Sequence, residues 1–152
     1  MPKMKVSVLV VALRSPVLVG VYNDNKLIKN YETTDMTSDA LPSIFKDILE
    51  KYELTNLYYA NGPGSYMSIK LTFIFLRTLS ITHNVSLGAS SAFNFCDNMP
   101  IKALGKKYFV LEGDEIVLET ITPVVTKFKI PDRLNEIEFS DENEPNYILP
   151  AV

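Results

Sequence analysis

The residues best suited to chemistry lie in a glycine-rich stretch, residues 60–70, whose centre reads Gly62-Pro63-Gly64-Ser65. This tetrapeptide cannot continue a strand, because proline lacks an amide donor and glycine favours turn conformations. A glycine-rich turn between a strand and a helix often presents backbone N–H groups that bind an anion. The alternative is a tight connection that needs glycine only for backbone geometry, since the sequence matches no complete phosphate-binding fingerprint. Lys70 lies further along, either in solvent or in contact with an anion or a partner.

The other reactive side chains favour structural roles. His83 is the only histidine, and no serine or cysteine nucleophile pattern surrounds it. Cys96 is the only cysteine, which excludes an intramolecular disulfide and predicts a small buried side chain rather than a thiolate. One histidine and one cysteine do not make a zinc site. Ser65 is expected to cap the following helix rather than to act as a nucleophile. We therefore predict no catalytic residue, no metal ligand and no cofactor.

The elements that position the turn begin with three apolar segments. They predict strands, arranged as an antiparallel meander, at residues 6–11, 17–22 and 26–31. An amphipathic helix is predicted at residues 38–52, with an N-cap among residues 37–39 and Pro42 in its first turn. A short strand at residues 56–60 then leads into the glycine-rich turn.

The segment after the turn, residues 68–81, is apolar around most of its circumference. Its alternating apolar residues favour a strand, but a strand of about thirteen residues would be unusually long, so we predict a helix. Such a helix must be buried on two sides, inside the fold or against another chain. The candidates for core or interface positions on the two helices are Ile44, Ile48, Ile69, Phe73, Phe75, Leu76 and Leu79.

The rest of the chain is predicted to hold short elements. These are a strand at residues 85–88, a short helix capped by Ser90 or Ser91, a hairpin of residues 108–112 and 115–121, and a strand at residues 124–130. From residue 131, six carboxylates accompany a single base, Arg133, which predicts an irregular, solvated acidic tail whose residues 147–150 could dock. We divide the chain into a main domain, a reduced β region and this tail, at residues 1–104, 105–130 and 131–152.

Composition restricts the classes of function. Hydrophobic residues make up 47% and charged residues 22% of the 152 residues, as in ordinary soluble globular proteins. A net charge of -3 gives no overall basic field to attract nucleic acid. No apolar run approaches the about 20 residues of a membrane span. The single cysteine and the lack of a cleavage pattern after the first apolar stretch predict a cytoplasmic protein.

The order of the predicted elements, β-β-β-α-β-α-β with further strands, resembles the ribonuclease-H-like half of an actin/sugar-kinase fold. The fold class is therefore α/β, with a mixed sheet flanked by helices. The chain also resembles the TsaB (YeaZ) family, which is grouped with M22 glycoprotease-like proteins. The resemblance rests mainly on residues 62–70, where the family has Gly-Pro-Gly-Ser-Phe-Thr-Gly-Leu/Val-Arg. Leu41-Pro42 and Gly88-Ala89-Ser90-Ser91 resemble two further family elements, and the likeness covers about residues 4–96.

Several positions depart from the family pattern. Where TsaB-like sequences keep an Asp-Thr after the first strand, this chain has Val11 and Ala12. Met36 stands near the position of a family histidine, and Met67-Ser68 replace Thr-Gly. The chain is also shorter than typical members, so we expect a divergent protein with a reduced second half.

The resemblance implies a non-catalytic scaffold subunit that binds TsaD, the subunit that transfers the threonylcarbamoyl group to the tRNA adenosine next to the anticodon. It implies that a TsaE-like ATPase can join the complex, that a homodimer can form when the chain is alone, and that tRNA is contacted only indirectly. Two alternatives stay open. The first is a small kinase or ATPase that binds a phosphate at the turn, although Val11 and Ala12 supply no metal ligand. The second is an M22-like protease, which would need a metal-ligand cluster.

Overall fold

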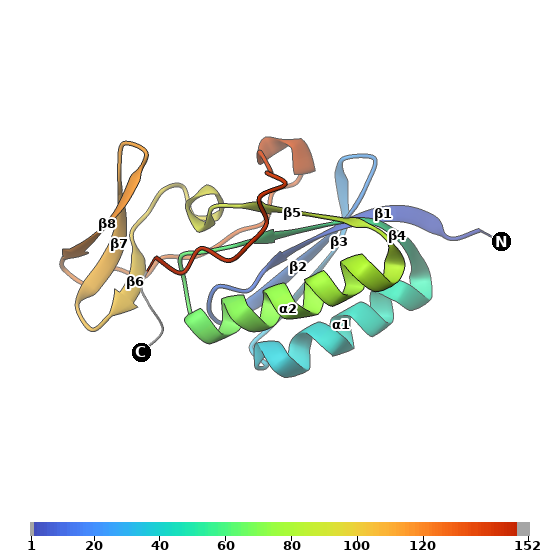
Figure 1. The fold of residues 1–152 in the computed structure, drawn as a ribbon, viewed down its shortest axis with the longest axis horizontal. Helices are drawn as coiled ribbons and strands as arrows, with labels where there is room; N and C mark the ends of the chain where they lie inside the picture. Colours follow the sequence, from blue (N-terminus) through green and yellow to red (C-terminus); the bar gives the residue numbers. More distant parts are fainter. Residues whose placement is uncertain (1, 149–152) are drawn as a thin grey trace.

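The computed structural model describes residues 2–148 and has a five-stranded mixed sheet at its centre (Figure 1). The sheet order is β3-β2-β1-β4-β5. Its strands are β1 (Met4–Val11), β2 (Val17–Asn23), β3 (Lys26–Thr33), β4 (Tyr52–Ala60) and β5 (Ser86–Ser90). β4 runs parallel to β1 and β5, whereas β2 is antiparallel to both β1 and β3. The predicted mixed sheet and its opening meander are confirmed.

The sheet has an apolar core on each face, because its central strands alternate buried side chains between the two sides. In β1, Val8 and Val10 belong to the core under the helices, and Leu9 and Val11 belong to the core on the opposite face. All four side chains are almost completely buried. The sheet is thus covered on both sides, and different segments supply the two covers.

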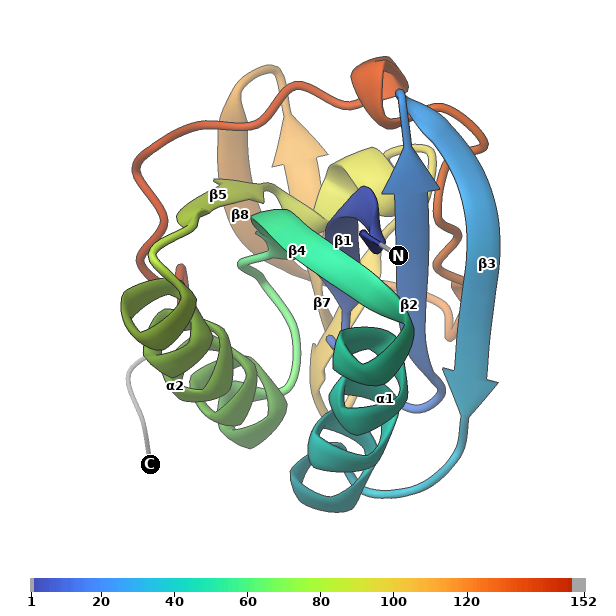
Figure 2. The same ribbon diagram turned by 90° about the vertical axis from the view of Figure 1, so that its right-hand side faces the viewer.

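Two helices cover one face, α1 (Thr37–Lys51) and α2 (Tyr66–His83), and they lie side by side (Figure 2). The rings of Phe45 and Phe75 meet edge to face between them, with centroids 5.3 Å apart. Both predicted helices are confirmed.

Two details of the first helix differ from the prediction. The N-cap residue is Met36, which makes no side-chain capping bond. The Thr37 hydroxyl instead donates to the Ser68 hydroxyl at 3.2 Å and so joins the starts of the two helices. The helix ends at Lys51 rather than at residue 52, because Tyr52 has an extended backbone and pairs with Met4 as the first residue of β4.

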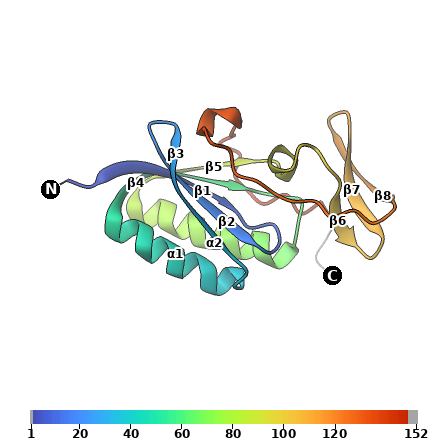
Figure 3. The ribbon, with the colours of Figure 1, turned by 180° about the vertical axis from the view of Figure 1, so that it is seen from behind.

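The opposite face is covered by a 3₁₀ turn, η1 (Ala92–Phe95), and by irregular chain. A second, three-stranded sheet lies at one end of the molecule (Figure 3). The hydroxyl of Ser91 caps η1 by accepting from the Phe93 amide at 3.4 Å. The predicted short helix is therefore confirmed, with Ser91 as its cap.

The second sheet consists of β6 (Ile101–Leu104), β7 (Lys107–Glu112) and β8 (Glu115–Thr120), all antiparallel. The predicted hairpin is confirmed as β7 and β8, and β6 is an additional strand. The predicted strand at residues 124–130 is wrong, because this irregular segment makes isolated contacts, such as the Lys129 amide donating to the Phe95 carbonyl at 2.8 Å. The boundary at residue 105 stays a prediction, although β6 precedes it and pairs with β7.

Residues 131–147, hereafter the strap, cross the face opposite the helices from β3 to β5 and then continue past β5 to the start of α2 (Figure 2). The Tyr22 hydroxyl donates to the Pro131 carbonyl at 2.6 Å, and the Tyr59 hydroxyl donates to the Asn143 carbonyl at 2.6 Å. Ser140 forms an antiparallel bridge with Ala89 on β5. The carboxylates are exposed as predicted, at Asp132, Glu136, Glu138, Asp141, Glu142 and Glu144.

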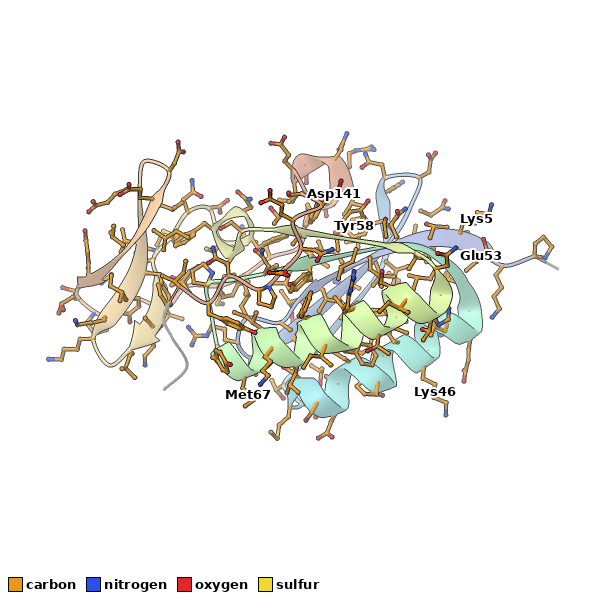
Figure 4. The ribbon with its side chains drawn as sticks, in the orientation of Figure 1. Lys5, Lys46, Glu53, Tyr58, Met67 and Asp141 are labelled. Atoms are coloured by element: carbon orange, nitrogen blue, oxygen red, sulfur yellow. The ribbon has the colours of Figure 1, made fainter. Side chains whose placement is uncertain are left out.

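The expectation of a merely solvated tail is wrong, because apolar side chains of the strap pack on the sheet. The Phe139 ring lies 4.4 Å from the Tyr58 ring, measured between centroids. Figure 4 places Tyr58 close to Asp141 on this face. Burial, followed by the charge of Asp141, raises the pKa of the Tyr58 hydroxyl. Tyr147 docks against Tyr66 at the start of α2, as the sequence allowed, with 4.5 Å between ring centroids. Residues 149 and 150 lie outside the described residues.

Candidate functional site

The glycine-rich turn joins β4 to α2 and is packed tightly on three neighbouring segments. Gly62 has a φ of 123°, and a Cβ atom there would clash with the Asn146 carbonyl of the strap. A Cβ atom at Gly64 would lie 2.9 Å from the Cβ of Leu13. Glycine is required at both positions, by backbone conformation and close approach at Gly62 and by close approach at Gly64.

Backbone hydrogen bonds of the turn point to these neighbours. The Ser65 amide donates to the Leu13 carbonyl at 2.8 Å, and the Asn61 amide donates to the Ser90 carbonyl at 3.0 Å. The Gly62 carbonyl accepts from the Ala92 amide at 2.9 Å. Because these groups already have protein partners, the geometry favours the structural interpretation of the turn over an anion cradle.

The side chains near the turn serve the start of α2. Ser65 caps the helix, as predicted, by accepting from the Ser68 amide at 3.4 Å. Lys70 is exposed, and its ammonium lies 5.9 Å from the centroid of the Tyr66 ring. Pro63, at the centre of the turn, is buried.

The candidate core or interface residues fall into two groups. Ile44, Ile48, Ile69 and Leu76 are at most 8% exposed and belong to the two cores. Phe73, Phe75 and Leu79 are half-buried and pack at the edge of the core under the helices. The first group is therefore unavailable to a partner while the fold is intact, and the second group is partly accessible.

A different set of residues forms the exposed face of α2. Met67, Ile74 and Ile81 are 57%, 51% and 67% exposed, and Met67 projects from the start of the helix away from the sheet (Figure 4). With Leu71 and Thr78 they follow alternating spacings of four and three residues. We define the α2 stripe by its members, Met67, Leu71, Ile74, Thr78 and Ile81. Spacings of this kind keep side chains on one side of a helix and are typical of helix–helix seams.

A groove of 320 Å³ runs between the two helices beside this stripe. α1 contributes Leu41 and Pro42 to its lining, and α2 contributes Ile74, Phe75 and Leu79. The groove has no charged lining residue. An apolar groove flanked by an exposed apolar stripe can bury hydrophobic side chains of another helix, because that removes both surfaces from water.

The remaining reactive residues do not join a site. Cys96 is buried, and burial raises the pKa of its thiol to about 11, so the prediction of a structural cysteine is confirmed. His83 is exposed in the last turn of α2. Within residues 2–148, histidine, cysteine and carboxylate side chains form no group of three placed to hold a metal ion. Neither helix in this range has the length and apolar character needed to cross a membrane.

Comparison with known proteins supports the fold. YeaZ from Pseudomonas aeruginosa matches with a TM-score of 0.61 and 12% sequence identity, covering 76% of this chain and 64% of that one. A structure described as an uncharacterized protein with similarity to peptidase YEAZ, also from Pseudomonas aeruginosa, matches with a TM-score of 0.60, the same identity and the same coverage. The chain has a YeaZ-like fold. No protein-family model and no curated protein sequence matches it.

The likeness to YeaZ has a defined extent. This chain spans 64% of the length of both YeaZ-related structures. At 12% identity the match shows the fold alone, and this low identity fits a divergent YeaZ-like chain.

Two features of the YeaZ-like chain were missed by the sequence analysis. The alternating spacing of the α2 stripe was available in the sequence and could have identified the exposed face of the helix. The docking of the strap had a weaker signal, the half-buried apolar residues Leu134, Ile137 and Phe139 among the carboxylates. Their spacing of three and two residues matches neither a helix nor a regular strand.

Proposed function

We propose that this chain is a non-catalytic binding subunit that docks α1 and α2 onto a helix of a TsaD-like protein. It would thereby support threonylcarbamoyl transfer to the tRNA adenosine next to the anticodon, with a TsaE-like ATPase as a further member of the complex. A cytoplasmic location and only indirect contact with tRNA belong to the same proposal. A homodimer through the same helices is the corresponding state of the isolated chain.

The observation that carries this proposal is the α2 stripe. Three of its apolar side chains are more than half exposed, although other residues of the same helix are fully buried in the core. Exposed apolar side chains that continue for four turns on one helix mark an interaction surface more often than a solvated one. Their alternating spacing fits another helix better than it fits a flat surface or a small molecule.

The YeaZ-like fold supports the choice of partner class. The sequence resemblance to the TsaB family includes the start of α2, and that family uses its two helices to bind TsaD or a second copy of itself. The neutral lining of the groove agrees with an apolar helix as the occupant rather than a nucleic acid, which would require basic residues.

The alternative of a phosphate-using enzyme is not favoured by the geometry. The glycine-rich turn uses its Ser65 amide to bind Leu13, and Val11 and Ala12 are buried apolar residues. A metal-bound nucleotide needs oxygen ligands in such a position. The geometry therefore favours the binding function.

The experiment is size-exclusion chromatography with light scattering on the chain, alone and mixed with a TsaD-like protein of the same organism. We expect a one-to-one complex that forms at the expense of any homodimer. Ile74→Asp is expected to weaken the complex at least about a hundredfold, because it places a charge in the middle of an apolar seam.

The matched control is Ile28→Asp, which makes the same change at an exposed isoleucine on β3, 40% exposed and outside both helices. This control should bind like the parent chain. A parent chain that ignores the TsaD-like protein would overturn the partner. Equal complex formation by both variants would overturn the assignment of the α2 stripe to the interface.

A further inference from the structure

A pocket of 360 Å³ lies between the β1–β2 turn and the irregular segment after β8. The turn contributes Arg14, Ser15 and Pro16, and residues 125–128 form the facing wall. Leu18 on β2 belongs to the core opposite the helices, so the pocket opens on a different face from the α2 stripe. We name it the β1–β2 pocket.

The facing wall is held in place by contacts of its own residues and of the residues that follow it. Thr126 is buried, and its hydroxyl donates to the Pro100 carbonyl at 2.5 Å. A few residues further on, the Lys129 amide donates to the Phe95 carbonyl, and Ile130 lies against Gly20. A wall anchored at both ends gives the pocket a defined shape before any ligand arrives, which reduces the entropic cost of binding.

Two positive charges line the pocket without being used by the fold. Arg14 and Lys127 are both exposed, and neither forms an ion pair within residues 2–148. By contrast, Lys51 and Lys129 form ion pairs with Asp47 and Asp97.

One opposite charge, that of Glu32, also lines the pocket, so the lining carries a net charge of about +1. A guanidinium and an ammonium without carboxylate partners are the groups that recognise phosphate and carboxylate oxygens.

The interior of the pocket is apolar. Leu18 is nearly buried and Phe128 half-buried, and with Pro16 they form the apolar part of the lining. Small-molecule sites typically have volumes of about 300–1,000 Å³, mostly apolar walls and a few polar groups that fix orientation. This pocket is at the small end of that range, which suits a ligand the size of one substituted ring.

We propose that the β1–β2 pocket binds a small organic oxyanion, a phosphate monoester or a carboxylate that carries one apolar ring or chain. Arg14 and Lys127 bind the oxyanion, and Leu18 and Phe128 contact the apolar part. Glu32 opposes the charge of the ligand and so weakens binding. The site is independent of the proposed docking of a TsaD-like protein, because it shares no lining residue with the groove or the α2 stripe.

The test is NMR titration of the isotope-labelled chain with phenyl phosphate and with benzoate, using phenol as the uncharged ring. We expect saturable shifts at the backbone amides of residues 14–18 and 125–128 with one or both oxyanions, and at least about tenfold weaker binding of phenol. The stronger of the two oxyanions identifies the preferred head group. Phenol binding as tightly as both oxyanions, or saturable shifts centred elsewhere, would overturn the proposal.

Two variants of pocket residues should change the affinity for the oxyanion in opposite directions, and a third variant is the control. The double variant Arg14→Ala/Lys127→Ala should weaken binding at least about tenfold, because each charge-assisted hydrogen bond is among the stronger polar contacts. Glu32→Gln should strengthen it several-fold by removing the like charge. The matched control, Lys102→Ala/Lys106→Ala, removes two lysines from the region of β6 and should leave binding unchanged.

Unchanged affinity in the Arg14→Ala/Lys127→Ala variant, or an equal loss in the lysine control, would overturn the proposal. The comparison of oxyanions with phenol uses the unaltered chain, so it decides the proposal even if a variant fails to fold. Loss of this site would leave the docking proposal untouched, because the two have different readouts and different residues.

Discussion

The two faces of the five-stranded sheet differ in what their covers leave exposed. On one face, α1 and α2 bury Ile48 and Leu76 fully but leave Ile74 half exposed to solvent. On the other face, the strap binds the sheet through the Tyr22 hydroxyl and backbone groups and turns its carboxylates outward. The irregular cover is thus polar outside, whereas the regular helical cover keeps apolar side chains there.

This difference shows where the molecule has surface left for a partner. A helix needs only one apolar stripe to pack on a sheet, so a second apolar stripe on α2 contributes little to the fold of the chain alone. The strap has no comparable second apolar surface, because its half-buried apolar side chains already contact the sheet.

The largest effect is expected from a pair of substitutions on α2. Leu76→Ala should lower the free energy of unfolding by about 2–5 kcal/mol, because it empties a fully buried site. Ile74→Ala should change it by less than about 0.5 kcal/mol, since its side chain is half exposed and lies outside the core. Urea unfolding followed by circular dichroism measures both. Similar losses in the two variants would show that the outer stripe also stabilises the isolated chain.

The next effect concerns the joint between the glycine-rich turn and the strap. Gly62→Ala should cost about 3 kcal/mol, because alanine is strained at a φ of 123° and its Cβ meets the Asn146 carbonyl. Gly113→Ala is the control, with a positive φ of 62° but open space around it, and should cost about 1 kcal/mol. Thermal unfolding compares the two. Equal costs would mean that the strap moves away from the added methyl group without a measurable loss of stability.

The strap's own anchors give a smaller effect. Tyr22→Phe and Tyr59→Phe each remove one hydrogen bond to a strap carbonyl and should cost about 1–2 kcal/mol. Hydrogen exchange at the Ala89 and Ser140 amides, which bind each other's carbonyls, should speed up in Tyr59→Phe. Exchange that stays at the parent rate would show that the strap is held by its apolar contacts instead.

Alkaline pH should weaken the two tyrosine anchors of the strap. Burial raises the pKa of the Tyr22 and Tyr59 hydroxyls above the ordinary value of about 10, so both keep their protons in the folded chain when the unfolded chain has lost them. Their contribution to stability is complete below about pH 10 and declines as the pH rises further. The double variant Tyr22→Phe/Tyr59→Phe should show a shallower decline in urea unfolding above pH 10. An unchanged slope would assign alkaline sensitivity to other groups.

Much of the fold followed from local sequence patterns. The near-continuous apolar run of β1, the amphipathic pattern of α1 and the hairpin around Gly113 each specify an element through period, propensity or turn chemistry. The capping of α2 by Ser65 was equally readable, because a cap depends on residues close in sequence. These features require no knowledge of distant neighbours.

Other features depended on contacts between residues far apart in the sequence. Thr37 reaches Ser68 instead of capping its own helix, and Lys129 in the irregular segment 124–130 donates to the Phe95 carbonyl instead of pairing within a strand. Local propensity cannot anticipate either outcome, because the competing partner lies more than 25 residues away.

Residue type and spacing were enough for the elements of the central sheet, its two helices, the β7–β8 hairpin and the family resemblance around residues 62–70, but not for β6 or for the irregular residues 124–130. The division of the apolar residues of α2 into core and surface came from tertiary contacts. Burial depends on the sheet, helix and strap that approach each side chain, and a helix that is apolar around most of its circumference has no wide polar face to fix its rotation in advance. Tertiary contacts also decided the role of the glycine-rich turn. Its backbone groups bind the carbonyls and amides of neighbouring segments and are therefore not free to bind an anion.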